Sequence, residues 1–160
     1  MRKMSYEIVV LGHITKDNLV IKYWSSKKDV LRKIHTVKAD RAEAEVTTGD
    51  KDLARAAKII ASWGSREVVI THTDGVMVYA DEELFEVPFV VSSLKGRTGR
   101  GDTCISAYHA ARLKLRPGAA AKFAAARTSL KLEQEGPFDR SYQHVLNNLA
   151  DDYQYGGLTE

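Results

Sequence analysis

The sequence predicts a single α/β layered domain whose sheet is largely parallel and carries one hairpin. Three observations indicate this class. Short apolar runs typical of buried strands alternate along the chain with stretches of helical period. The 160 residues, 44% of them hydrophobic, are enough for one core and too few for two enzyme domains. An Asp-Gly pair between two apolar runs predicts the hairpin.

The first third of the chain predicts strands and one short helix. Residues 8–11 form a continuous apolar run that ends in a glycine, as a strand covered on both faces requires. Residues 19–21 are a candidate second strand. The composition then changes abruptly over residues 23–33, where a short helix at 29–33 is predicted, and residues 34–37 are extended again.

The next segment predicts one helix and then three strands. The helix opens at residues 48–50, and small or apolar residues recur at helical spacing from Leu53 until Trp63-Gly64 closes it. The strands lie at residues 67–71, 76–79 and 84–91. Asp74-Gly75 forms the turn between the first two, and Pro88 makes the third an edge strand or the site of a bulge.

Three helices are predicted in the C-terminal half, at residues 103–115, 119–132 and 141–153. Arg116-Pro117-Gly118 separates the first two, and Gly136-Pro137 ends the second. The second helix is rich in alanine. Because small side chains permit close approach, we expect this helix to be buried against a neighbouring element.

Composition excludes several classes of function. The 24 Lys and Arg against 21 Asp and Glu leave a net charge of only +3 without a clustered patch, so we expect no nucleic-acid or membrane partner. A single cysteine, Cys104, excludes a disulfide framework, and the five histidines lack metal-ligand spacing. The sequence has neither a long apolar run nor a secretory leader pattern, so a cytoplasmic protein is expected.

Residues 95–103 (Lys-Gly-Arg-Thr-Gly-Arg-Gly-Asp-Thr) carry most of the functional information. They place three glycines between a strand and a helix. Glycines let the backbone approach a ligand closely, and the amides at a helix N-terminus attract anions, so the segment predicts a phosphate-binding loop. Its spacing matches neither a Walker loop nor a dinucleotide-binding fingerprint.

Asp102 has two interpretations. Asp is a preferred N-cap, so the residue can simply begin the helix. A carboxylate beside a phosphate-binding loop can also accept the proton of an attacking hydroxyl group, which typically contributes about 10²–10⁴-fold to the rate.

The stretch from Gly99 to Tyr108 resembles the second signature of the ribokinase (PfkB) family of carbohydrate and nucleoside kinases. The resemblance implies a three-layer α/β/α sandwich and the cofactors ATP and Mg²⁺. It implies that Asp102 is the base that deprotonates a sugar or nucleoside hydroxyl. The backbone of Gly99, Arg100 and Gly101 would stabilise the transferred phosphoryl group.

Other stretches follow the family's order. Residues 38–49 are similar to its Asn-x-x-Glu segment, with Asp40 in place of Asn; Glu43 is then the acidic residue that organises magnesium, or else a solvated helix acid. Asp17 would bind substrate hydroxyls, although it also suits a turn. The remaining nucleotide-binding residues that the resemblance implies are Thr71, Gly75, Thr98, Gly99, Gly101, Ala125 and Ser129. For Gly75 the alternative is that Asp74-Gly75 is a hairpin turn that needs no ligand. For Ala125 the alternative is that packing alone explains the alanines.

Relatives in this family are about twice as long. We therefore expect residues 1–160 to form one truncated ribokinase-like nucleotide-binding domain, in which the first strand joins the C-terminal half of the fold near residues 23–33 and the lid is largely absent. Exposed sheet edges and apolar helix faces then favour a homodimer or larger homo-oligomer. Three hypotheses stay open: an ATP-dependent sugar or nucleoside kinase, a non-catalytic nucleotide-binding or subunit-interaction protein, and a shortened product without its own role.

Overall fold

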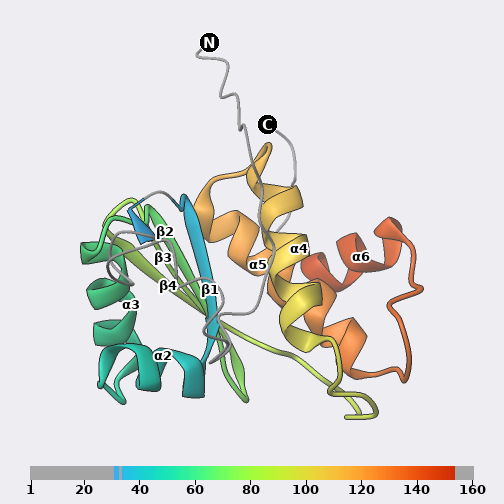
Figure 1. Ribbon diagram of the computed structural model, residues 1–160. Coiled ribbons are helices and arrows are strands. Elements are labelled where there is room, and N and C mark those ends of the chain that lie inside the picture. Colours follow the sequence, from blue (N-terminus) through green and yellow to red (C-terminus); the bar gives the residue numbers. More distant parts are fainter. Residues whose placement is uncertain (1–30, 33, 154–160) are drawn as a thin grey trace.

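The computed structural model describes residues 31, 32 and 34–153 (Figure 1). The strands predicted at residues 8–11 and 19–21, most of the helix predicted at 29–33, and the candidate substrate ligand Asp17 lie outside the described residues. In chain order the elements are β1 (Thr36–Asp40), α2 (Arg41–Thr48), α3 (Leu53–Ser62), β2 (Glu67–Thr71), β3 (Gly75–Ala80), β4 (Glu83–Pro88), α4 (Arg100–Arg112), α5 (Pro117–Leu132) and α6 (Tyr142–Tyr153).

The described strands form one sheet in the order β1-β2-β3-β4. Only β1 and β2 are parallel, and the other two pairs are antiparallel, so the expectation of a largely parallel sheet is wrong for this part of the chain. The connections explain the difference. Two helices link β1 to β2 and give the chain room to cross over, whereas short turns join β2, β3 and β4. Asp81 and Glu82 both have positive φ in the β3–β4 turn, as a tight hairpin requires.

Helices cover both faces of the sheet, which confirms the three-layer α/β/α fold (Figure 1). Successive side chains of a strand point to opposite faces. Val68 and Ile70 of β2 therefore pack with α2 and α3, while Val69 between them packs with α4, α5 and α6. No helix among residues 31, 32 and 34–153 is both long and apolar enough to cross a membrane.

Helix boundaries follow local chemistry that the periodicity alone misses. Helix α2 is absent from the sequence-based prediction, which opened a helix at residues 48–50. Gly49 instead ends α2 in the left-handed conformation, with φ of 77°, and Asp52 caps α3. Helix α5 begins at Pro117, two residues earlier than predicted, because proline suits the first helical position. Its alanines are buried, as predicted.

A buried carboxylate ties β2 to α4. Glu67 is only 4% exposed. Its side chain accepts hydrogen bonds from the Tyr108 hydroxyl at 2.7 Å and from the Arg112 guanidinium at 2.6 and 3.0 Å. Burial alone would raise the pKa of Glu67, but these hydrogen bonds outweigh burial and hold the pKa below its ordinary value.

Candidate functional site

The loop from residue 89 to residue 99 joins β4 to α4 and is tied to the end of α5. The Val90 amide donates to the Ser129 hydroxyl at 3.0 Å. The amides of Lys95 and Gly96 both donate to the carbonyl of Leu132, at 2.9 and 3.1 Å. These bonds position the glycine-rich part of the loop against residues 131–138.

Gly99, rather than Asp102, is the N-cap of α4. Gly99 has φ of 78°, the left-handed conformation that glycine adopts at no steric cost, and its carbonyl accepts from the Thr103 amide at 2.9 Å. The helix therefore begins three residues before the predicted start, and the N-cap interpretation of Asp102 is wrong. Asp102 lies in the first turn, where a carboxylate is favoured by the helix dipole and where the leading amides lack intrahelical acceptors.

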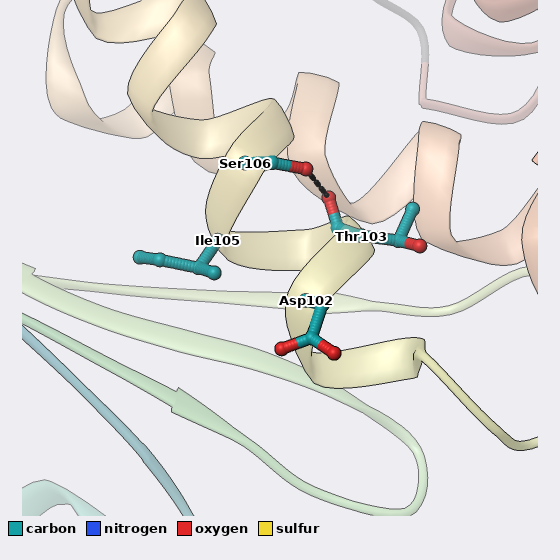
Figure 2. Close-up of a pocket in the computed structure, with 4 residues that line it drawn as sticks. All are labelled: Asp102, Thr103, Ile105 and Ser106. Atoms are coloured by element: carbon teal, nitrogen blue, oxygen red, sulfur yellow. Dashed lines mark hydrogen bonds between the residues drawn. The ribbon is translucent and has the colours of Figure 1, made fainter. Parts of the chain in front are cut away.

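The Asp102 side chain stands between two surface hollows. The first has a volume of about 380 Å³ and is lined by Asp102, Thr103, Ile105 and Ser106, all from the first two turns of α4 (Figure 2). The second has a volume of about 610 Å³ and lies over the glycine-rich loop; it is lined by Lys95, Gly96, Arg97, Thr98, Gly99, Asp102, Thr103, Lys131, Glu135, Gly136, Pro137 and Phe138. Asp102 and Thr103 are shared, so the exposed carboxylate can reach a ligand in either hollow.

Lys38 and Glu43 approach the same helix end from β1 and α2. A Cβ atom added to Gly101 would lie 2.8 Å from the Lys38 Nζ, so the ammonium group sits directly beside the start of α4. Lys38 Nζ is also 3.7 Å from Glu43 Oε2. Sequence reasoning missed Lys38. Its position near the carboxyl end of a parallel strand, where α/β proteins bind ligands, was the available signal.

Glu43 is not an ordinary solvated acid. Its Oε2 accepts from the Asp40 amide at 2.7 Å, and Asp40 Oδ1 accepts from the Glu43 amide at 2.8 Å. This reciprocal pair is a capping box, which the D-x-x-E spacing could have predicted. Asp40 thus serves as the helix cap in the segment that resembles Asn-x-x-Glu.

Magnesium fits this arrangement only as a hydrated ion. Mg²⁺ usually keeps several waters and binds one or two carboxylates together with substrate phosphates. Among the described residues, no three or more His, Cys, Asp or Glu side chains gather into a metal cage. The Glu43 side chain is 24% exposed and already shares an oxygen with a backbone amide. Glu43 therefore suits contact with the ion's water shell.

Of the predicted nucleotide ligands, Thr98 and Gly99 line the second hollow, and Thr71, Gly75, Gly101, Ala125 and Ser129 do not. Thr71 is buried at the carboxyl end of β2, where it pairs with Asp40. Gly75 begins β3 and faces β4 so closely that a Cβ there would lie 2.4 Å from the Val87 carbonyl oxygen. That contact alone requires glycine at this position.

Ala125 and Ser129 are fully buried within α5. The Ser129 hydroxyl bonds to the Ala125 carbonyl at 2.8 Å and to the Tyr153 hydroxyl at 2.8 Å, besides accepting from Val90. These contacts join α5, α6 and the loop after β4. Neither residue lines the second hollow, and their assignment to a nucleotide stays a prediction.

Comparison with known proteins identifies what this arrangement is similar to. A model of the pfkB family of carbohydrate kinases matches residues 11–141. A cytidine kinase of Thermococcus kodakarensis is 30% identical over 93 residues, which are 56% of this chain and 34% of that protein. The chain thus spans about a third of the length of that relative.

Solved structures give the same picture. A pyrophosphate-dependent myo-inositol-1 kinase is 37% identical, with a TM-score of 0.70 over 82% of this chain and 47% of its own. A pyrophosphate-dependent kinase of the ribokinase family, complexed with a pyrophosphate analogue and myo-inositol, is 38% identical, with a TM-score of 0.68 over 75% and 43%. Arabidopsis thaliana ribokinase, complexed with ribose and ATP, shares the fold at 21% identity, with a TM-score of 0.69 over 76% and 43%.

Proposed function

The chain belongs to the pfkB family of carbohydrate kinases, and from that premise we propose that it transfers a phosphoryl group to a hydroxyl group of a sugar or nucleoside. The observation that carries the proposal is the place of Asp102 between the two hollows. The glycine-rich hollow would hold the phosphoryl donor, and the hollow along α4 would hold the acceptor. One carboxylate then faces both reactants.

In the proposed reaction Asp102 accepts the proton of the acceptor hydroxyl as its oxygen attacks the phosphorus of the donor. The bond between that phosphorus and the donor's bridging oxygen breaks, and the electron pair leaves with the bridging oxygen. The first amides of α4 and the Lys38 ammonium would stabilise the developing charge. A bound Mg²⁺ would neutralise phosphate oxygens, with Glu43 contacting its waters.

ATP is the donor that we propose first, because ribokinase-fold proteins bind it. Pyrophosphate is a second candidate, favoured by two observations. Kinases that are 37–38% identical to this chain use it. Of the predicted nucleotide ligands, Thr98 and Gly99 of the glycine-rich loop line the second hollow, whereas Thr71, Gly75, Ala125 and Ser129 do not. A donor without a nucleoside would need only the phosphate-binding part.

The test is Mg²⁺-dependent phosphoryl transfer to sugars, nucleosides and myo-inositol, with ATP and pyrophosphate compared as donors. Asp102→Asn should reduce turnover by about 10²–10⁴-fold and leave donor binding largely unchanged. Asp151→Asn, which removes an exposed carboxylate on α6, is the matched control. Undiminished turnover in Asp102→Asn would rule out the proposed base.

The alternative is a non-catalytic nucleotide-binding or subunit-interaction protein. One observation favours it: the hollow beside Asp102 is lined by α4 alone, so no other described element covers the acceptor. Phosphoryl transfer normally needs a site shielded from water. Under this alternative the chain would bind a donor and phosphorylate no acceptor.

We also infer that the chain forms a homodimer or larger homo-oligomer. Val46 and Leu113 are 72% and 75% exposed, and β4 lies at one end of the described sheet with Leu84 exposed. Exposed apolar side chains and a strand edge that no other described strand pairs with favour association. Light scattering at micromolar concentration should give a mass of at least two chains, and a stable monomer would contradict the inference.

A further inference from the structure

We propose that Lys131 is a further binding residue of the donor site, where its buried ammonium group holds the negative charge of the donor's phosphates. The inference rests on the proposed function. It goes beyond that function because it assigns a donor-binding role to a residue of α5 that lines the hollow over the glycine-rich loop. The shared chemistry is a phosphate group of either ATP or pyrophosphate.

Lys131 is unusually buried for a lysine. It lies in the last turn of α5 and is only 3% exposed. Lysine is almost never fully buried unless it is paired with an opposite charge. Within the described part of the chain, its Nζ has one hydrogen-bond acceptor, the Gln134 carbonyl at 3.4 Å, and no carboxylate oxygen within 4.0 Å. The ammonium charge is therefore not compensated by a described acidic residue.

The surroundings of Lys131 direct this charge toward the proposed phosphate site. Lys131 lines the same hollow as Gly99 and Asp102. Its Cε would lie 3.9 Å from a Cβ atom added to Gly99, the N-cap of α4. The ammonium thus lies on the wall that faces the start of this helix, and its charge adds to that of the helix amides.

The contacts of Gln134 fix the position of the ammonium group. The Gln134 carbonyl oxygen that accepts from Lys131 would also lie 2.4 Å from a Cβ atom added to Gly96. Lys131 is consequently held where the glycine-rich loop meets the chain after α5. An ammonium group has three donors. One is used on Gln134, which leaves two for phosphate oxygens.

A purely structural role would have to explain the burial. A lysine in the last turn of a helix interacts favourably with the negative end of the helix dipole. An exposed ammonium group gains that interaction without the cost of desolvation, so the dipole does not account for a lysine that is 3% exposed. The two roles differ in a measurable way. A structural lysine raises the folding stability of the chain without ligand. A ligand-binding lysine lowers that stability and stabilises the complex once the anion is bound.

The experiment compares the wild-type chain with Lys131→Met, which keeps the length of the side chain and removes its charge. Titration calorimetry at constant ionic strength measures the dissociation constants of pyrophosphate and of ATP, each with Mg²⁺. Thermal unfolding without ligand is measured on the same samples. Lys114→Met, at an exposed lysine just after α4, is the matched control.

We expect Lys131→Met to weaken binding of both donors by about 10- to 100-fold, the range for a hydrogen bond to a charged group. Its melting temperature without ligand should be unchanged or higher, and Lys114→Met should match the wild type in both measurements. Unchanged donor affinity in Lys131→Met would overturn the assignment while leaving the proposed function in place. A lowered melting temperature together with weaker binding would also overturn it, in favour of a structural role. A wild-type chain that binds neither donor would overturn the proposed function and this assignment with it.

Discussion

Asp40 and Glu43 each accept a hydrogen bond from the other's backbone amide, at 2.8 and 2.7 Å. The pair closes the first turn of α2 directly at the carboxyl end of β1. It also holds the Glu43 carboxylate 3.7 Å from the Lys38 ammonium group, which lies beside Gly101 at the start of α4. A residue that we assign to magnesium is thus also a structural cap, and the two roles have to be separated by the choice of substitution.

Two substitutions at Glu43 separate them. Glu43→Gln keeps an oxygen that can accept from the Asp40 amide, so stability should change by less than about 0.5 kcal/mol, while Mg²⁺-dependent turnover falls. Glu43→Ala removes this hydrogen bond as well and should cost about 0.5–1.5 kcal/mol, the net contribution of one hydrogen bond. Urea unfolding and the Mg²⁺ dependence of turnover measure the two effects. Equal loss of stability in both variants would contradict the separation.

Gly101→Ala should leave the fold intact and weaken donor binding. The added Cβ would meet only the end of the Lys38 side chain, at 2.8 Å from its Nζ, and a flexible side chain can move. The ammonium group would then leave its place beside the α4 amides. Circular dichroism should be unchanged and the dissociation constant of the donor should rise about 10-fold or more. Donor binding equal to that of the wild type would show that this position of Lys38 is unimportant.

Gly75→Ala should destabilise the fold. Here the added Cβ would lie 2.4 Å from the Val87 carbonyl oxygen, which belongs to the backbone of β4 and cannot move without breaking the β3–β4 ladder. Overpacking of this kind typically costs about 1–3 kcal/mol. Denaturant unfolding measures the loss, and Gly101→Ala is the matched glycine substitution. A stability loss confined to Gly101→Ala would reverse our interpretation of both glycines.

Arg112→Met should be strongly destabilising, because it removes the main partner of buried Glu67. Breaking a buried ion pair from one side costs about 3–5 kcal/mol. The variant's free energy of unfolding at pH 7 should fall accordingly, and Glu67→Gln with Arg112→Met should recover part of the loss. A change below about 1 kcal/mol in Arg112→Met would show that the Tyr108 hydrogen bond and His35, whose Nε2 lies 3.4 Å from Glu67 Oε1, are enough for this carboxylate.

The same cluster predicts an acid-side loss of stability. The pKa of Glu67 is held below its ordinary value of 4.5 in the folded chain. A group with a depressed pKa stabilises the fold above its ordinary value, and this contribution is lost as the pH falls through the folded pKa. Unfolding free energies measured from pH 6 downward should therefore fall below about pH 4.5, less steeply in Glu67→Gln. Parallel curves would contradict the assignment to Glu67.

Local sequence patterns determined much of the fold. The alternation of apolar runs with helical periods gave the layered class, and the Asp74-Gly75 turn gave the β2–β3 hairpin, which the structure has. The resemblance carried by residues 99–108 predicted the family, which the match over residues 11–141 confirms. These features depend on neighbouring residues, so a single sequence contains them.

Only the tertiary structure decided which distant groups meet. Nothing local in Lys38 indicates that its ammonium group lies beside Gly101, since that contact depends on α4 packing against the end of β1. The burial of Lys131 depends in the same way on the loop after α5 lying against Gly96. Asp102 was found from its motif, whereas its place between two hollows required the packed helix. The sequence by itself determined the elements and the reactive side chain, through short-range periodicity and turn chemistry. The charges around that side chain were decided by packing between distant segments, such as Lys38 and Gly101, which are about sixty residues apart, and no local pattern records such packing.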